Sequence, residues 1–213
     1  MAQMKINLKQ FQTGIIYSSL VLFFLFLFSG CSGISVADTP KRTYLLDIPL
    51  PPIPPVNPNG KTLLVSIPNA APGFDTPAQL YIRHQNVLEY YSKSQWVDTP
   101  ARMLLPLLVL RIEATGHFAA ILSAATSPVA GEIRLDTEIV RLYQDFLSEP
   151  SQVILMLRVQ LLDMVARQVI ATKVFKILSD AATTDAQGGM MATNEAVTRV
   201  LNEIAGFVVK QVE

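Results

Sequence analysis

The sequence predicts an α+β domain in which two principal helices pack on an antiparallel β-sheet. Residues 153–161 place apolar groups at every second position, which is the period of a β-strand, and long strand candidates lie on either side. A stretch after residue 193 repeats apolar groups at helical spacing, and a second helix is predicted after Pro100. Strands grouped in this way favour a sheet covered by helices.

The first 31 residues have the pattern of a secretory signal that ends at a cysteine. Lys5 and Lys9 precede an unbroken apolar stretch from residue 20 to 28, and small residues stand directly before Cys31. A basic start, a short apolar segment and small residues before a cut define a signal peptide. Because a cysteine after the cut is typical of bacterial lipoproteins, we predict that residues 1–30 are a lipoprotein signal peptide. Cys31 is then the lipidated residue, carrying palmitate or a similar acyl chain.

An uncleaved membrane-spanning helix is the alternative interpretation of this segment. Its apolar stretch would run from Gly14 to Gly30, which is shorter than the roughly 20 apolar residues that a span requires. It would also leave the cysteine unexplained, whereas two or three acyl chains would hold the protein on a membrane durably. Ser32, rather than an aspartate, follows the cysteine. By the sorting rule for bacterial lipoproteins, we expect the periplasmic face of the outer membrane.

Composition limits the partners and the covalent chemistry of the mature chain. The full chain has 17 basic and 17 acidic residues, and loss of the signal removes two lysines, which leaves a net charge of about −2. This balance offers no basic surplus for nucleic acid, so no nucleic-acid partner is expected. Cys31 is the one cysteine. Its acylation would leave no disulfide, so an ordinary apolar core must stabilise the domain.

Residues 31–60 are interpreted as the acylated N-terminus and a proline-rich linker. A short strand is expected at residues 44–48, and six prolines follow between Pro49 and Pro58. Proline fixes φ and removes a hydrogen-bond donor, so this run should be extended and semi-rigid. We expect a spacer of roughly 30 Å that holds the folded domain, residues 61–213, away from the membrane. A proline-motif ligand for another domain is the alternative.

The first part of the domain is expected to contain short strands. Asn59-Gly60 is a turn signal before a strand at residues 62–67, and residues 68–77 are expected to form a loop. A hairpin follows, with its arms at residues 79–83 and 87–91 and a short polar link between them.

A helix is expected to begin at Thr99-Pro100, with Thr99 as its N-cap and proline at its first position. Pro106 lies inside this helix and should kink it or shift its start. Gly116 is expected to end it, and a short strand at residues 118–122 follows.

Three long strands are expected to form an antiparallel meander at residues 133–146, 153–161 and 169–177, with a polar turn at residues 163–168. A loop is expected at residues 181–190, which include Gly188-Gly189. The last helix should begin near Thr193 or Asn194. Its apolar residues form one stripe that can cover a sheet face, at Val197, Val200, Leu201, Ile204 and Val208.

No constellation of residues in the sequence supports catalysis. His84 is expected in a hairpin turn and His117 after the end of a helix, where surface roles are the simplest interpretation. Asp136 and Glu138 would share one face of a strand, but two carboxylates are too few ligands for Ca²⁺. No motif of a zinc hydrolase, serine hydrolase or phosphate-binding loop is present. We therefore predict a protein that is not an enzyme, with no cofactor and no metal.

The segment from Trp96 to Pro100 carries the only tryptophan at an expected strand-to-helix corner. Two interpretations of Trp96, Asp98 and Thr99 remain open. As a partner contact, the segment would use the preference of aromatic residues for interface hot spots. As a structural corner, Trp96 would fill the core while Asp98 and Thr99 cap the helix.

Several short motifs follow one another along the chain in a definite order. They are residues 29–31, 44–47, 82–83, 88–91, 96–104, 135–138, 144–146, 171–175 and 192–197. In this order they resemble the ABC-type transport auxiliary lipoprotein family over nearly the whole mature chain. The order carries the resemblance, because the motif around the cysteine is shared with many other lipoproteins.

The resemblance implies a non-enzymatic, auxiliary component of a mammalian-cell-entry-type lipid transporter of Gram-negative bacteria. In such a system an inner-membrane ABC ATPase and permease drive transport, and a periplasmic lipid-binding protein bridges the gap. The lipoprotein would dock that protein at the outer membrane. Its strand edges could also pair with a second copy to form a homo-oligomer. The alternative is an envelope-assembly lipoprotein that activates a cell-wall enzyme, whereas a lipid-anchored hydrolase is disfavoured for want of a nucleophile–base pair.

Overall fold

The computed structural model describes residues 40–212. The expected signal peptide and the lipidation site at Cys31 therefore lie outside the described residues. None of the helices in the described part of the chain has the length and hydropathy that a membrane span requires.

Three long antiparallel strands form the centre of the sheet, as predicted. β7 (Ile133–Asp145) pairs with β8 (Gln152–Asp163), and β8 pairs with β9 (Gln168–Asp180). Along β7 and β8, every second side chain is buried, which matches the alternation in the sequence. The meander and the turn between β8 and β9 are therefore confirmed.

The sheet as a whole is mixed, so the expectation of a purely antiparallel sheet is wrong. Three segments run parallel to β7: β2 (Thr62–Val65), β3 (Asn69–Ala70) and β4 (Ala78–His84). β6 (Ala120–Ser123) lies beside β2, also in parallel. Parallel neighbours need long connections, and a hairpin and a helix separate β2 from β6 in the chain. Short strands carry no sign of direction in their sequence, which is why the pattern did not reveal this.

The expected hairpin is present, and its second arm is longer than predicted. β4 pairs with β5 (Val87–Trp96) in antiparallel register. Asn86, in the turn, has a φ of 63°, which asparagine tolerates better than most residues. β1 (Arg42–Tyr44) lies parallel to the end of β5 and places Tyr44 opposite Trp96.

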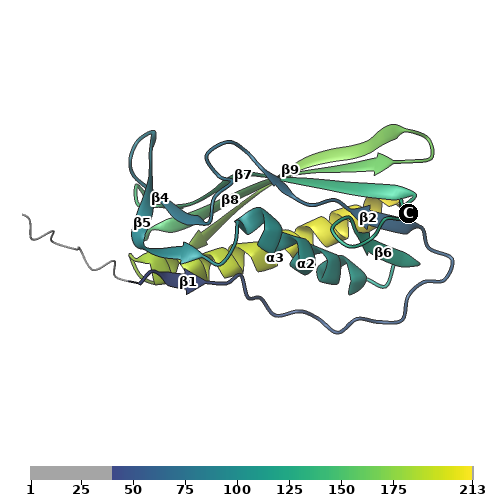
Figure 1. Ribbon diagram of the computed structural model, residues 1–213, viewed down its shortest axis with the longest axis horizontal. Coiled ribbons are helices and arrows are strands. Elements are labelled where there is room, and N and C mark those ends of the chain that lie inside the picture. The colour runs from purple at the N-terminus through teal and green to yellow at the C-terminus, as the bar shows by residue number, and fades with distance from the viewer. Residues whose placement is uncertain (1–39, 213) are drawn as a thin grey trace, which may run out of the picture. The chain divides into compact units, whose positions relative to one another are not determined.

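Both helices cover the same face of the sheet (Figure 1). α2 (Pro100–Glu113) starts at the predicted proline and contains Pro106, and Gly116 follows its end with a φ of 63°. α3 (Ala186–Val212) packs against β8 and β9. The five residues of the predicted apolar stripe are all buried in the core: Val197, Val200, Leu201, Ile204 and Val208. The sequence therefore predicted correctly which side of α3 covers the sheet.

α3 begins earlier than predicted, and residues 186–190 are helical rather than part of a loop. The Asp185 carboxylate accepts the Gly188 N–H at 2.8 Å and the Thr183 hydroxyl at 2.7 Å. These bonds, with that from Gly188 first, hold the pKa of Asp185 below its usual value. They also satisfy a free N–H of the first turn, as an N-cap does. The two glycines, expected in a loop, instead allow the helix to approach its neighbours closely.

The proline-rich segment begins against the domain, which differs from the free spacer that we expected. Leu46 and Ile48 are buried in the core, although neither belongs to a strand. The Arg111 guanidinium donates a hydrogen bond to the Pro49 carbonyl oxygen at 2.7 Å. Burial of the two apolar side chains explains why residues 46–49 join the folded part of the chain.

Candidate partner-binding face

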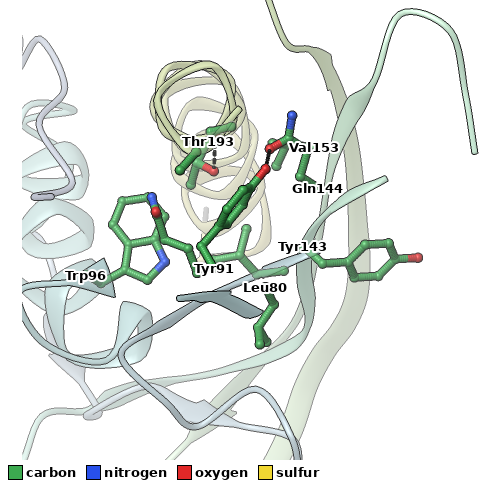
Figure 2. Close-up of a pocket in the computed structure, with 11 residues that line it drawn as sticks. Leu80, Tyr91, Trp96, Tyr143, Gln144, Val153 and Thr193 are labelled. Carbon is green, nitrogen blue, oxygen red and sulfur yellow. Dashed lines mark hydrogen bonds between the residues drawn. The ribbon is translucent and has the colours of Figure 1, made fainter. Parts of the chain in front are cut away.

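Trp96 lies in the core, at the end of β5. The residue is only 4% exposed, and its backbone N–H donates to the Pro77 carbonyl oxygen at 2.7 Å. The indole borders a cavity of about 20 Å³, together with Tyr91 and Thr193 (Figure 2). Because the ring is buried, it agrees with the structural-corner interpretation, and a partner at the surface would not reach it.

Asp98 and Thr99 occupy the turn before α2, but the expected side-chain cap is absent. Thr99 has the extended backbone of an N-cap, yet its side chain makes no capping hydrogen bond, and its Oγ1 is buried without a partner. Asp98 instead accepts the Thr99 N–H at 2.7 Å and forms an ion pair with Arg102 at 3.2 Å. Both charged groups of this pair are largely exposed, so it adds little stability.

A partly buried polar network links β5, β7 and the segment before β8 beside the cavity. The Tyr91 hydroxyl donates to Gln144 Oε1 at 2.9 Å, and Gln144 Nε2 donates to Ser151 Oγ at 3.0 Å (Figure 2). Burial raises the pKa of Tyr91 to about 12, so its hydroxyl stays a donor at neutral pH. A space of about 20 Å³ holds no more than one water molecule. The network therefore has the character of a packing element rather than a substrate site.

The other residues considered for chemistry do not converge on one site. His84 is exposed at the end of β4, and the His117 ring packs edge-on against Phe118 at 5.1 Å, after α2. Asp136 accepts a hydrogen bond from Arg134 Nε at 2.8 Å, so an arginine already neutralises its charge. Within residues 40–212, no group of three or more residues of metal-ligand type lies together.

The face of the sheet that the helices leave uncovered has a charged half. On it, the Arg134 guanidinium bridges Asp136 and Ser66, with the Ser66 Oγ at 2.9 Å from Nε. Glu138 and Arg158 lie directly opposite each other on β7 and β8. All five residues border a shallow hollow of about 330 Å³. Because its arginines and carboxylates balance, this half has no net charge with which to select an ion.

The other half of the uncovered face is apolar. Tyr143, Ile154 and Leu178 are neighbours on β7, β8 and β9, and we call these three residues the apolar row. Figure 2 shows the Tyr143 ring pointing away from the cavity. Leu178 is 43% exposed, and Tyr90 on the nearby β4–β5 hairpin is 66% exposed. Tyr143 and Ile154 are half-buried, and the Phe74 ring stacks on Tyr143 at 6.5 Å. Apolar side chains that remain partly exposed together on a sheet face are typical of a protein contact.

A second cluster joins an arginine to three aromatic rings at the end of β4. The Arg83 guanidinium lies over the rings of Tyr81 and Phe146, at 5.0 and 5.2 Å from their centres. The Tyr81 ring also packs against Tyr91 at 4.7 Å. This cluster is not predicted from the sequence. The alternation of Tyr81 and Arg83 on one strand face was a usable signal, but Phe146 arrives only through the parallel pairing of β4 with β7.

Comparison with known families gives a match over most of the described chain. A family model described as ABC-type transport auxiliary lipoprotein component matches residues 44–205. The match runs from the end of β1 to the second half of α3. None of the curated proteins compared with this chain is significantly similar to it in sequence.

Solved structures share the fold at low sequence identity. Protein XCC0632 from Xanthomonas campestris, of the DUF330 family, is 22% identical; the match covers 80% of this chain and 96% of that one, with a TM-score of 0.72. An uncharacterized protein is 12% identical, with coverage of 79% and 99% and a TM-score of 0.61. The hypothetical protein CT253 from Chlamydia trachomatis is 10% identical, with coverage of 72% and 98% and a TM-score of 0.52. At these identities the likeness shows the fold alone.

Proposed function

This chain belongs to the ABC-type transport auxiliary lipoprotein family, and on that premise we propose that it docks a periplasmic lipid-binding protein at the outer membrane. The family match to residues 44–205 carries the proposal, because it includes nearly all of the described domain. An ABC ATPase and permease of the inner membrane would supply the energy for lipid transport. This chain would then contribute contacts rather than chemistry.

In this proposal the chain is held on the membrane by acyl chains on Cys31. Because residues 46–49 pack on the domain, the segment from Cys31 to Pro40 would be the tether between the domain and the membrane. Nine residues of extended chain reach at most about 30 Å. The domain would therefore stay close to the membrane surface, where it could hold the end of a partner that crosses the periplasm.

The apolar row is the surface that best fits a protein partner. Ile154, on β8, lies at its centre. Arg141 on β7 and Lys176 on β9 lie beside the row on the same face. An apolar centre with a polar border is the usual composition of a protein interface. The chain carries equal numbers of basic and acidic residues, so electrostatic steering would be weak and contact would depend on apolar burial.

Crosslinking in whole cells, followed by purification of the tagged full-length lipoprotein in detergent, tests the proposal. We expect the periplasmic lipid-binding protein of an ABC lipid transporter to be recovered with it, together with the ATPase and permease. We also expect deletion of the protein to make the outer membrane sensitive to detergent. Recovery of cell-wall synthases alone would overturn the proposal and favour a lipoprotein that activates a cell-wall enzyme.

A further inference from the structure

The turn between β8 and β9 exposes an apolar tip. Met164 is 40% exposed, Val165 77% and Val169 52%, and we call these three residues the hairpin tip. Their side chains are apolar, so while they stay exposed they contribute little burial to the stability of the folded state. Neither the core nor the apolar row includes them. They therefore call for an explanation other than folding.

The turn is built to hold the tip in one conformation. Asp163 Oδ1 accepts the N–H groups of Val165 and Ala166 at 2.9 and 2.7 Å. Arg167 has a φ of 57°, in the left-handed region where glycine or asparagine would be less strained. Glycine or asparagine at position 167 would therefore give a more stable turn. A fixed apolar tip loses little conformational entropy when it binds, which favours a role in recognition.

The hairpin tip lies at one end of the domain, and this position bears on whether it faces the membrane or the periplasm. Pro40 precedes β1, which pairs with the end of β5 at Trp96. Trp96 borders the same cavity as Val153, so β1 lies near the start of β8. From Val153 to Asp163, β8 extends for about 33 Å. The β8–β9 turn thus lies at the other end of the domain from β1 (Figure 1). Because a tether from Cys31 to Pro40 reaches at most about 30 Å, the end of the domain that carries β1 would lie nearer to the membrane than the hairpin tip.

The charged side chains beside the tip indicate what kind of partner surface would complement it. Asp163 Oδ1 accepts the two turn N–H groups, and the carboxylate keeps its negative charge beside the tip. Neither of the ion pairs found within the described residues involves Arg167, which is exposed beside the tip. The surface presented is therefore three apolar side chains bordered by one guanidinium and one carboxylate. Its complement is an apolar recess with a polar border.

We propose that the hairpin tip inserts into an apolar recess with a polar border on the periplasmic lipid-binding protein that this chain docks. The inference rests on the proposed function, and it deepens it by naming the contact. A bilayer and a second copy of this chain are the other occupants that the chemistry of the tip would allow. The crosslinked products distinguish these two occupants from the proposed partner.

A photocrosslinking residue placed at Val165 of the full-length, lipidated protein provides the first test. Its matched control is the same residue at Leu147, which is 57% exposed in the turn between β7 and β8, at the other end of the meander. We expect crosslinks to the periplasmic lipid-binding protein from position 165 and not from position 147. Crosslinks from position 165 to lipid alone, to a second copy alone, or equally from both positions would overturn the inference.

Substitution provides the second test. The double variant Met164→Asp with Val165→Asp should reduce recovery of the periplasmic partner about tenfold or more, and Leu147→Asp should leave it unchanged. An unchanged thermal unfolding midpoint would show that the hairpin variant still folds. If the wild type recovers the partner and the double variant does so equally well, the hairpin inference fails while the proposed function stands. If the wild type recovers no transporter component, the proposed function fails first.

Discussion

Gly189 of α3 lies directly against the side-chain amide of Gln144 in β7. A Cβ atom at position 189 would overlap Gln144 Oε1. The amide is not free to move aside, because Tyr91 donates to its oxygen at 2.9 Å and its nitrogen donates to Ser151 at 3.0 Å. This contact sets how closely the first turns of α3 approach the sheet.

We predict that Gly189→Ala lowers the free energy of unfolding by about 1–3 kcal/mol, because the added methyl group overpacks a fixed site. Gly206 is the matched control, since a Cβ at that position meets nothing within 4 Å. Gly206→Ala should raise the free energy of unfolding by about 0.5–1 kcal/mol through helix propensity. Urea denaturation of both variants measures the difference. Stabilisation by both substitutions would show that the contact with Gln144 does not constrain α3.

Leu201 lies at the centre of the stripe with which α3 covers the sheet and is 1% exposed. Leu201→Ala should cost about 2–5 kcal/mol, from lost burial and from the cavity that remains. Asn202, the next residue, is exposed, and Asn202→Ala should change stability by no more than about 0.5 kcal/mol. Thermal unfolding of the two variants checks this. Similar midpoints would mean that α3 is a peripheral helix.

The elements with a strong period could be predicted from the sequence, and those fixed by tertiary contacts could not. The alternation along β8 and the stripe of α3 identified both elements and their buried sides. The start of α3 was not predicted because Gly188 and Gly189 favour a loop in the sequence pattern. In the structure Asp185 caps the helix, and the two glycines allow its first turn to pack closely. The parallel strands were missed because a strand pattern does not reveal direction.

The candidate site was predictable only in part. Trp96 is one of the residues that the sequence singles out, and the structure buries it in the core, but the apolar row could not be foreseen. Tyr143, Ile154 and Leu178 are far apart in the sequence, and only the register of three strands brings them together. The tip at Val165 carried a local signal, an apolar turn without glycine or asparagine, but the turn was taken as polar.

The Tyr91 hydroxyl gives a prediction for alkaline pH. Burial raises its pKa to about 12 in the folded protein, from an ordinary value of about 10 in the unfolded chain. The folded state therefore favours the protonated form. Its contribution to stability is fully present below about pH 10 and is lost as pH rises towards 12. Unfolding curves measured across this range should show the loss.

The variant Tyr91→Phe should remove that part of the alkaline pH dependence. At neutral pH it should also cost about 1–3 kcal/mol, because the buried Gln144 Oε1 loses its donor. Tyr90→Phe is the control, since Tyr90 is 66% exposed. An alkaline profile that is the same in wild type and Tyr91→Phe would contradict the assignment to Tyr91.

Cys31 should be the lipidated first residue of the mature protein. Mass spectrometry of the amino-terminal peptide should find acyl chains on this cysteine and no residues before it. Cys31→Ser should leave an unlipidated precursor that does not reach the outer membrane. An unmodified Cys31 still joined to Gly30 would exclude the lipid anchor, and with it the tether on which the proposed function depends.

The last prediction concerns the apolar row. Leu178→Asp would place a carboxylate among apolar side chains on the uncovered sheet face, and burying that charge against a partner would be costly. We expect recovery of the partner protein to fall about tenfold or more. Thr172→Asp is the control, because Thr172 lies on the same face of β9 but in its polar half, opposite Gln160. Sedimentation of the Leu178→Asp protein distinguishes the occupants of the row: a change in its oligomeric state with undiminished partner recovery would assign the row to a contact between identical copies.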